Sequence, residues 1–147
     1  MELSLLAMTV VGAAALLQGR EGVPGVTYIG HDKVSAAISQ SASLLRQPEL
    51  NLLVMGSHRS EPAQAELHEK ETDIFYVVQG EATLVTGGKL IGSKVTSPGQ
   101  QIGTGIEGGQ VYHLTTGDVI VIPAGTPHWC KEVPKSISYF IVKVLKP

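Results

Sequence analysis

Two groups of side chains in this sequence have the types and spacing needed for chemistry. The first is Glu66-Leu67-His68, followed by Asp73. On a β-strand, residues two apart share a face, so Glu66 and His68 would project together, and a later inward residue such as Asp73 could complete an open cation site. The alternative is a solvated, charged strand end, because the run from Glu69 to Glu71 follows. For this group alone, the solvated strand end is the stronger interpretation.

The second group lies toward the end of the chain. Residues 117–128 read GDVIVIPAGTPH. This pattern predicts a buried strand that enters a rigid Pro-Gly-Pro turn and leaves it at His128, the first residue of the next strand. A single histidine in such a place is usually structural. Its interpretation changes when the two groups are taken together.

Together, the two groups resemble the two motifs of the cupin superfamily. The second family motif is Gx5PxGxxHx3N. This sequence supplies it as Gly117, Pro123, Gly125 and His128, with Glu132 where the family usually has asparagine. The spacing of this motif is matched throughout.

The first family motif is HxHx3-4Ex6G, and the sequence matches its spacing with two changes of residue type. The matching positions are Glu66, His68, Asp73 and Gly80. Glu66 replaces the first histidine, and Asp73 replaces the glutamate. The resemblance covers the chain from about Asn51 to its end. The strings HEKETDIFYVVQGEATLVTGG and GDVIVIPAGTPHW are also similar to small exported bacterial cupins.

The resemblance implies an all-β fold, a cupin-type jelly-roll β-barrel with a short N-terminal helix, and a metal at the barrel centre. Carried across, the family's ligand positions are Glu66, His68, Asp73 and His128. Two imidazoles and two carboxylates suit one divalent transition metal, Mn, Fe, Zn, Ni or Co, better than Ca or Mg. The implied function is metal-dependent chemistry on a small organic molecule, of oxygenase, isomerase or lyase type. The alternative is a noncatalytic module that binds a small molecule or a sugar.

A competing alignment pairs His68 with Lys70, which would place an ammonium at a ligand position and exclude a metal. The alignment with Glu66 is preferred because it keeps a known gap length and leaves Lys70 in a polar loop. His113 is expected on the surface. Cys130 and Glu132 share strand parity with His128, so either could line the cavity. Tyr76 and Trp129 have the opposite parity and are expected to serve packing or an interface.

Composition excludes several other classes. The length of 147 residues predicts one domain, and 43% hydrophobic with 16% charged residues predicts that it folds. Eleven basic and thirteen acidic residues give a net charge of −2 without a basic run, which argues against a nucleic-acid partner. The single cysteine, Cys130, excludes an intramolecular disulfide and Cys-rich zinc sites. The sequence contains no GxSxG elbow, P-loop or dinucleotide fingerprint after a strand.

Hydrophobic periodicity predicts the elements that must position these residues. A helix is expected over His31 to Leu45, closed by Gln47-Pro48. Short strands rich in Val, Ile and Tyr are expected at residues 51–55, 65–68, 74–78, 82–85, 111–114, 119–122 and 137–144. Residues 87–110 contain many glycines and are expected to form a long hairpin or flexible loop that borders the site.

The first residues are interpreted separately. Residues 3–17 read LSLLAMTVVGAAALL and contain no charge. This pattern favours a signal peptide that spans residues 1–19, and the alternative is a buried N-terminal helix. Residues 20–50 would then be a linker and the N-terminal helix, and 51–147 the barrel. The mature protein is expected to be periplasmic or secreted, with no membrane contact, or cytoplasmic if the segment is not a signal. The apolar segment SISYFIVKVL predicts a homodimer through a paired strand edge.

Overall fold

The computed structural model describes residues 25–146. Within that range the chain forms one α-helix, one 3-10 helix and twelve strands. The helices are α1 (His31–Gln40) and η1 (Pro48–Leu50), and the strands are β1 (Ser43–Gln47), β2 (Leu52–Arg59), β3 (Ala65–His68), β4 (Glu71–Thr86), β5 (Lys89–Ile91), β6 (Lys94–Ser97), β7 (Gln100–Gly103), β8 (Gly105–Glu107), β9 (Gln110–Thr115), β10 (Val119–Ile122), β11 (His128–Glu132) and β12 (Ile137–Leu145). The all-β class with a short N-terminal helix is confirmed.

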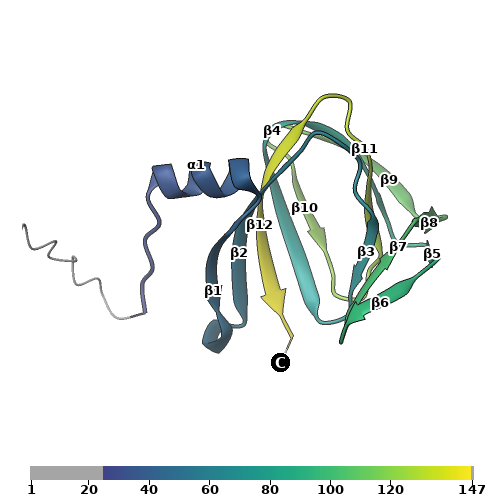
Figure 1. Ribbon diagram of the computed structural model, residues 1–147, viewed down its shortest axis with the longest axis horizontal. Helices are drawn as coiled ribbons and strands as arrows, with labels where there is room; N and C mark the ends of the chain where they lie inside the picture. Colours follow the sequence, from purple (N-terminus) through teal and green to yellow (C-terminus); the bar gives the residue numbers. More distant parts are fainter. Residues whose placement is uncertain (1–24, 147) are drawn as a thin grey trace, which may run out of the picture.

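Ten of the strands are hydrogen-bonded into one sheet that curls into a barrel (Figure 1). The order is β1-β2-β12-β4-β11-β3-β7-β6, and β9 and β10 also pair with β4. We call β1, β2, β12, β10 and the first half of β4 wall A, and the second half of β4 with β9, β11, β3, β7 and β6 wall B. All of the pairings are antiparallel.

The long strand β4 belongs to both walls because it changes direction at Gly80. This residue has φ +87°, and a Cβ there would lie 2.0 Å from the carbonyl oxygen of Ser136. Only glycine fits that backbone and that contact. The sequence predicts two separate strands here, at 74–78 and 82–85, whereas the structure joins them into one strand that bends.

The space between the walls is apolar over most of its length. Side chains that alternate along β4 and β12 point inward, as the twofold period of a strand requires. The buried core cluster consists of Phe75, Val77, Ala82, Leu84, Leu114, Ile122, Ile137, Tyr139 and Ile141. Burial of these side chains holds the two walls together, and the same inward rows continue into the candidate site described below.

The helix α1 lies across the outside of wall A and is shorter than expected. The predicted helix over His31 to Leu45 is wrong beyond Gln40, because Ser41 adopts φ 52° and ends the helix. The hydroxyl of Ser41 donates to the carbonyl oxygen of His58 at 3.1 Å and accepts from its N–H at 2.9 Å. These bonds turn the chain into β1, so that Leu44 and Leu45 belong to a strand paired with β2 instead of extending the helix.

The sequence predicts a long hairpin or a flexible loop over residues 87–110. The flexible loop is wrong, because β6 pairs with β7 and β5 pairs with β8 as in a hairpin. This segment contains β5, β6, β7 and β8, and β7 pairs with β3 in wall B. Glycines with positive φ form the turns between these strands. Their number is the reason that the composition is also compatible with a flexible loop. The short sheet of β5 and β8 lies over the outside of wall B, where Gly105 packs against the ring of Trp129.

The remaining expected strands agree with the structure to within a few residues, except that β2 extends to Arg59. The segment proposed as a dimer edge is not an edge, because β12 is paired on both sides, with β2 and with β4. The dimer itself stays a prediction. The signal-peptide assignment lies outside the described residues. Among the described residues, no helix is long and apolar enough to cross a membrane.

Candidate metal centre

The four residues singled out from the sequence lie together at one end of the barrel interior. Glu66 and His68 lie on β3 of wall B, two residues apart and on one face. His128, the first residue of β11, is the direct cross-strand partner of Glu66. Asp73 comes from β4 on the opposite side, in wall A. Side chains from both walls therefore meet at one point, because the sheet curls into a barrel and brings the two walls face to face.

The donor atoms of these residues are close enough to share one ion. The Nε2 atoms of His68 and His128 each lie 3.7 Å from Oε2 of Glu66. Each also lies 3.7 Å from Oδ2 of Asp73. Two atoms that both bind a transition metal at about 2.1 Å are at most about 4.2 Å apart. Glu66, His68 and His128 thus form a cluster that could hold a metal.

His128 supplies the most informative atom of the cluster. Its side chain is buried, and its Nδ1 faces the carbonyl oxygen of Thr126 at 3.2 Å. A carbonyl can only accept, so Nδ1 carries the proton and the neutral ring leaves a lone pair on Nε2. Burial lowers the pKa of His128, which keeps the ring neutral. Among the described residues, its Nε2 is the buried side-chain atom left without a hydrogen-bond partner.

His68 is oriented in the same way by a different partner. Its Nδ1 contacts Oε1 of Gln100 on β7, while the amide nitrogen of Gln100 donates to Oε1 of Glu71 at 2.9 Å. Because the amide nitrogen is used by Glu71, the oxygen faces His68 and accepts from Nδ1. The Nε2 of His68 is then directed at the two carboxylates. Both histidines therefore present Nε2 to the same point, as metal-binding imidazoles do.

The charges of Glu66 and His68 stabilise each other. The imidazole of His68, 3.7 Å away, lowers the pKa of Glu66, against the opposing effect of burial. Burial opposes the charged form of His68, but the nearby carboxylates of Glu66 and Asp73 raise its pKa overall. A metal at this point would displace the proton on Nε2 of His68, since binding requires neutral imidazole.

Asp73 differs from the other three residues because it has an ion-pair partner that the sequence analysis missed. Its two oxygens accept hydrogen bonds from Nζ of Lys143 on β12 at 2.8 and 2.9 Å. Lys143 also lies 2.9 Å from Oε2 of Glu71. Burial alone would raise the pKa of Glu71, but the ammonium of Lys143 outweighs it and lowers that pKa. Lys143 and Asp73 are direct cross-strand partners, which explains the short contact.

The structure separates the two alignments of the first motif. Glu66 projects into the cluster with His68, whereas Lys70 is exposed in the turn between β3 and β4. Lys70 therefore does not occupy a position beside His68 in the cluster. This geometry agrees with the alignment that pairs Glu66 with His68.

The other candidates lie outside the cluster. His113 is exposed and pairs with Glu81 at 3.0 Å, as expected for a surface histidine. Cys130 packs against the apolar core, and burial raises the pKa of its thiol. Glu132 is exposed and accepts a hydrogen bond from Thr83. A register shift between Cys130 and Glu132 breaks the parity with His128 that had suggested a cavity position for Glu132.

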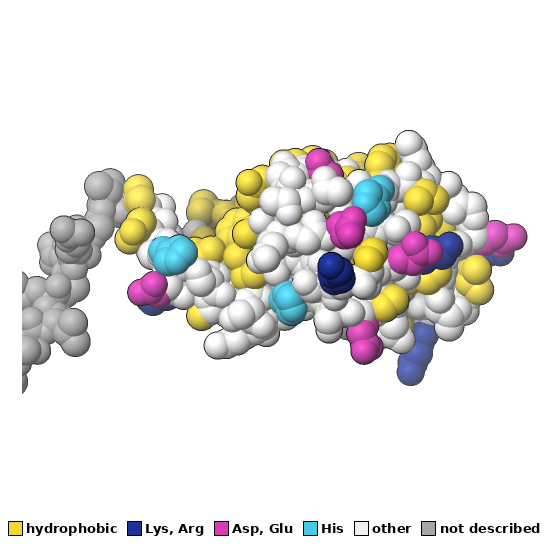
Figure 2. Space-filling model, turned by 90° about the horizontal axis from the view of Figure 1, so that it is seen from above, with side chains coloured by type: hydrophobic (Ala, Val, Ile, Leu, Met, Phe, Trp, Pro, Cys, Tyr) yellow, Lys and Arg dark blue, Asp and Glu magenta, His cyan; other side chains and the backbone are white. Residues whose placement is uncertain are grey.

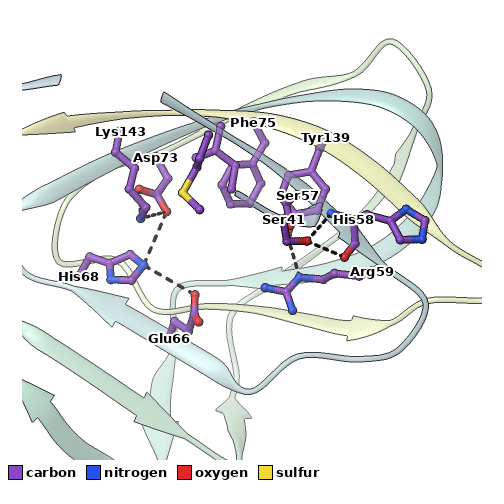
Figure 3. A pocket seen from close by; sticks show the side chains of 12 residues that line it. Ser41, Ser57, His58, Arg59, Glu66, His68, Asp73, Phe75, Tyr139 and Lys143 are labelled. Atoms are coloured by element: carbon purple, nitrogen blue, oxygen red, sulfur yellow. Dashed lines mark hydrogen bonds and ion pairs between the residues drawn. The ribbon is translucent and has the colours of Figure 1, made fainter. Parts of the chain in front are cut away.

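A pocket of about 330 Å³ opens from the cluster into the barrel. Figure 3 shows Glu66, His68, Asp73 and Lys143 on one side of it and Arg59 on the other. Its apolar lining comes from Met55, Phe75, Ile141 and the ring of Tyr139. Neither Arg59 nor Lys143 was singled out from the sequence. The signal available was strand parity, which places Lys143 in register with the inward Tyr139 and Ile141.

Comparison with known proteins agrees with this architecture. A family model described as Cupin matches residues 62–144, more than half of the chain. The chain belongs to the cupin family. The matched segment contains all four residues of the cluster and ends just beyond Lys143. No curated protein matches the sequence.

One solved cupin structure shares the fold, and two further solved structures align less closely. The cupin domain of Cnp3 from Schizosaccharomyces pombe aligns with a TM-score of 0.51 and 10% identity, over 71% of this chain and 59% of that one. An uncharacterized conserved protein with a double-stranded beta-helix domain from Klebsiella pneumoniae aligns with a TM-score of 0.49 and 17% identity, over 71% and 70%. A cupin protein from Bacteroides fragilis gives 0.45 and 12%, over 65% and 66%. At these identities the likeness concerns the fold, and function has to be argued from the site.

Proposed function

We propose that this cupin is a metal-dependent enzyme that acts on a small organic molecule in the barrel pocket. The proposed metal is one divalent transition ion held by Glu66, His68 and His128, with Asp73 as a fourth ligand or as a partner through water. Two imidazoles and one carboxylate with open positions form the ligand set typical of non-haem iron enzymes, and Mn, Zn, Ni and Co also suit these donors.

The observation that carries the proposal is the free Nε2 of His128. A buried ring nitrogen without a partner is costly unless something binds it. Here the lone pair of that nitrogen faces two carboxylates, which a cation would bridge. An ordinary structural histidine would be expected to satisfy both nitrogens with protein groups. The donor set therefore fits a transition metal.

The charge of the cluster supports the same proposal. Glu66, Glu71 and Asp73 contribute three negative charges, and Lys143 contributes one positive charge. Once a metal has displaced the proton of His68, both histidines are neutral, and the excess of two negative charges equals the charge of one divalent cation. Because the carboxylates lie in a partly buried pocket, that excess is more costly there than in water.

When bound, the metal would supply Lewis-acid or oxygen-activating chemistry. The residues of the chain hold and shape the site around it. Gln100 and the carbonyl of Thr126 fix the two imidazole rings. Lys143 fixes Asp73 and Glu71. Phe75 and its apolar neighbours in the pocket lining limit the access of water to the organic part of a bound molecule.

Elemental analysis of protein purified without a chelating affinity tag tests the proposal. We expect close to one transition metal ion per chain in the wild type and almost none in His128→Ala. Glu66→Ala is expected to weaken metal binding strongly, whereas Lys70→Ala, which changes an exposed residue of the same segment, is expected to leave metal content unchanged. Stoichiometric metal in both His128→Ala and Glu66→Ala would refute the site.

The second candidate is a noncatalytic module that binds a small molecule in the same pocket. The pocket beyond the cluster, with its apolar wall and Arg59, favours small-molecule binding in either case. The number of open metal positions separates the two functions. A metal whose coordination is completed by protein atoms would favour the binding module, and a metal with exchangeable water would favour the enzyme.

A further inference from the structure

The pocket has a second polar end that the metal centre does not use. Arg59 is the last residue of β2, and Figure 3 shows its guanidinium directed across the pocket toward Glu66. Its Nε donates a hydrogen bond to the phenol oxygen of Tyr139 at 2.8 Å. The Tyr139 side chain is buried in the core cluster, so this bond fixes the direction of the guanidinium.

The remaining donors of Arg59 have no carboxylate partner in the part of the chain that the structure describes. No ion pair joins Arg59 to an acidic residue within 4.0 Å in residues 25–146. An arginine carries five N–H donors, and the bond to Tyr139 uses one. A half-buried guanidinium with its outer edge open to a pocket is arranged to receive an acceptor from solution.

Charge specifies what kind of acceptor fits. The acidic groups and Lys143 leave an excess of two negative charges, which a divalent metal would neutralise. Arg59 then leaves the loaded pocket with one positive charge. A bound molecule with one negative charge would make the pocket neutral, whereas a neutral molecule would leave the charge of Arg59 uncompensated in a partly buried place.

We propose that Arg59 binds the carboxylate of a small monocarboxylic acid whose other end reaches the metal centre. The planar guanidinium matches a carboxylate with two parallel hydrogen bonds. The apolar body of the acid would lie on Phe75, Met55 and Ile141, which line the pocket between its two polar ends. This inference rests on the proposed function, because the charge balance counts the metal. It adds the chemical class of the substrate and the residue that selects it.

Calorimetric titration of the zinc-loaded wild-type protein with benzoate and with benzamide tests the proposal without a mutation. The two probes have nearly the same shape and differ in charge. We expect benzoate to bind at least about tenfold more tightly, the usual range for a charge-assisted pair. Equal affinities, or no binding of benzoate, would overturn the proposal.

Variants then separate Arg59 from the metal as the source of any preference for the acid. Arg59→Met keeps an apolar side chain of similar length and removes the guanidinium. Arg46→Met makes the same change at an exposed position of β1. Benzoate affinity is expected to fall about tenfold or more in Arg59→Met and to be unchanged in Arg46→Met. Benzoate binding that is equally tight in Arg59→Met would assign the carboxylate to the metal and overturn the proposal.

Two further measurements keep the result unambiguous. Zinc content is measured for each variant, and Arg59→Met is expected to retain one zinc per chain, so loss of the metal and loss of acid binding are distinguishable. Arg59→Lys keeps the charge and loses the two-pronged geometry. If Arg59→Met does not fold, an affinity for benzoate in Arg59→Lys that lies below that of wild type supports the proposal, and an unchanged affinity overturns it.

Discussion

The two ends of the barrel interior are built from the same strands and have opposite character. Along β12 the inward residues are Ile137, Tyr139 and Ile141, and then Lys143. The first three belong to the apolar core, and the fourth lies among carboxylates. Along β4 the inward row changes in the same way, from Val77 through Phe75 to Asp73. On each strand, the last core residue and the first site residue are therefore neighbours on the inward face, two positions apart in the sequence.

This difference shows where stability and function are located. The apolar end buries side chains against each other, which stabilises the fold. The polar end collects three carboxylates, two histidines and one ammonium, and it leaves one histidine nitrogen without a partner. As a set, such groups add little net stability compared with apolar packing, although removal of one member of an ion pair leaves its partner uncompensated. Clusters of this kind are typical of binding sites. Variants at the two ends should therefore change different measurements.

The largest effect on folding is expected at the apolar end, with Leu84→Ala. The Leu84 side chain is buried in the core cluster. Its truncation leaves a cavity, and we expect a loss of about 3 kcal/mol in the free energy of unfolding. Urea denaturation measures this loss. Metal content at low temperature should stay near the wild-type value, and a variant that loses metal while remaining folded would contradict the separation of the two ends.

Lys143→Met is expected to have a smaller effect on folding, and to lower stability while it raises the affinity for zinc. Removal of the ammonium leaves Asp73 and Glu71 without their partner, which should lower the unfolding free energy of the metal-free protein by about 2 kcal/mol. The same change removes a positive charge beside the metal centre, so zinc should bind more tightly. Denaturation without metal and calorimetric zinc titration measure the two effects. Lys135→Met, at an exposed position, is the control.

Tyr139→Phe is expected to change both the stability of the core and the binding of the acid in the pocket. The phenylalanine ring preserves the packing in the core and loses the hydrogen bond that holds Arg59. We expect a loss of about 1 kcal/mol in unfolding free energy and a weaker affinity for benzoate with unchanged zinc content. If benzoate affinity stays at the wild-type value, Tyr139 does not position Arg59 for binding.

The smallest effect is expected on the surface, at the pair of His113 and Glu81. Both side chains are about half exposed, and their contact of 3.0 Å lies outside the pocket. Glu81→Gln should change the unfolding free energy by less than about 0.5 kcal/mol. Figure 2 shows acidic and basic side chains interspersed on the face viewed there, a pattern in which single exposed pairs matter little. A large change would assign this histidine a role that the geometry does not indicate.

The sequence predicted the parts of the site that depend on local spacing. Glu66 and His68 share a face because strands alternate, and the Pro-Gly-Pro turn determines where His128 stands. Strand alternation places Lys143 on the same face as Tyr139 and Ile141, but which face is inward, and where Arg59 lies, depend on which strands pair. Before the pairing of the strands is known, the sequence around a cationic residue in an apolar strand looks the same whether its side chain faces the barrel interior or water.

The wrong end of the predicted helix and the open alternatives for residues 87–110 have a related cause. Leu44 and Leu45 fit a helical face, but pairing of β1 with β2 outweighs that local preference after Ser41 ends the helix. The glycines of residues 87–110 are compatible with a long hairpin or a flexible loop, and in the structure they form the turns between short paired strands. Tertiary pairing decided both segments, and one of them delivers Gln100 to His68.

The central position of β12 has a consequence for how the protein folds. This strand comes last among the twelve, yet it joins β2 to β4 in the middle of wall A. Until β12 arrives, β2 and β4 have no contact through the sheet, and the pocket lacks one side. Pairings between segments so distant in sequence require closure of long loops, which slows folding into the range of milliseconds to seconds. Barrel closure and assembly of the pocket are therefore expected to be a single late kinetic event.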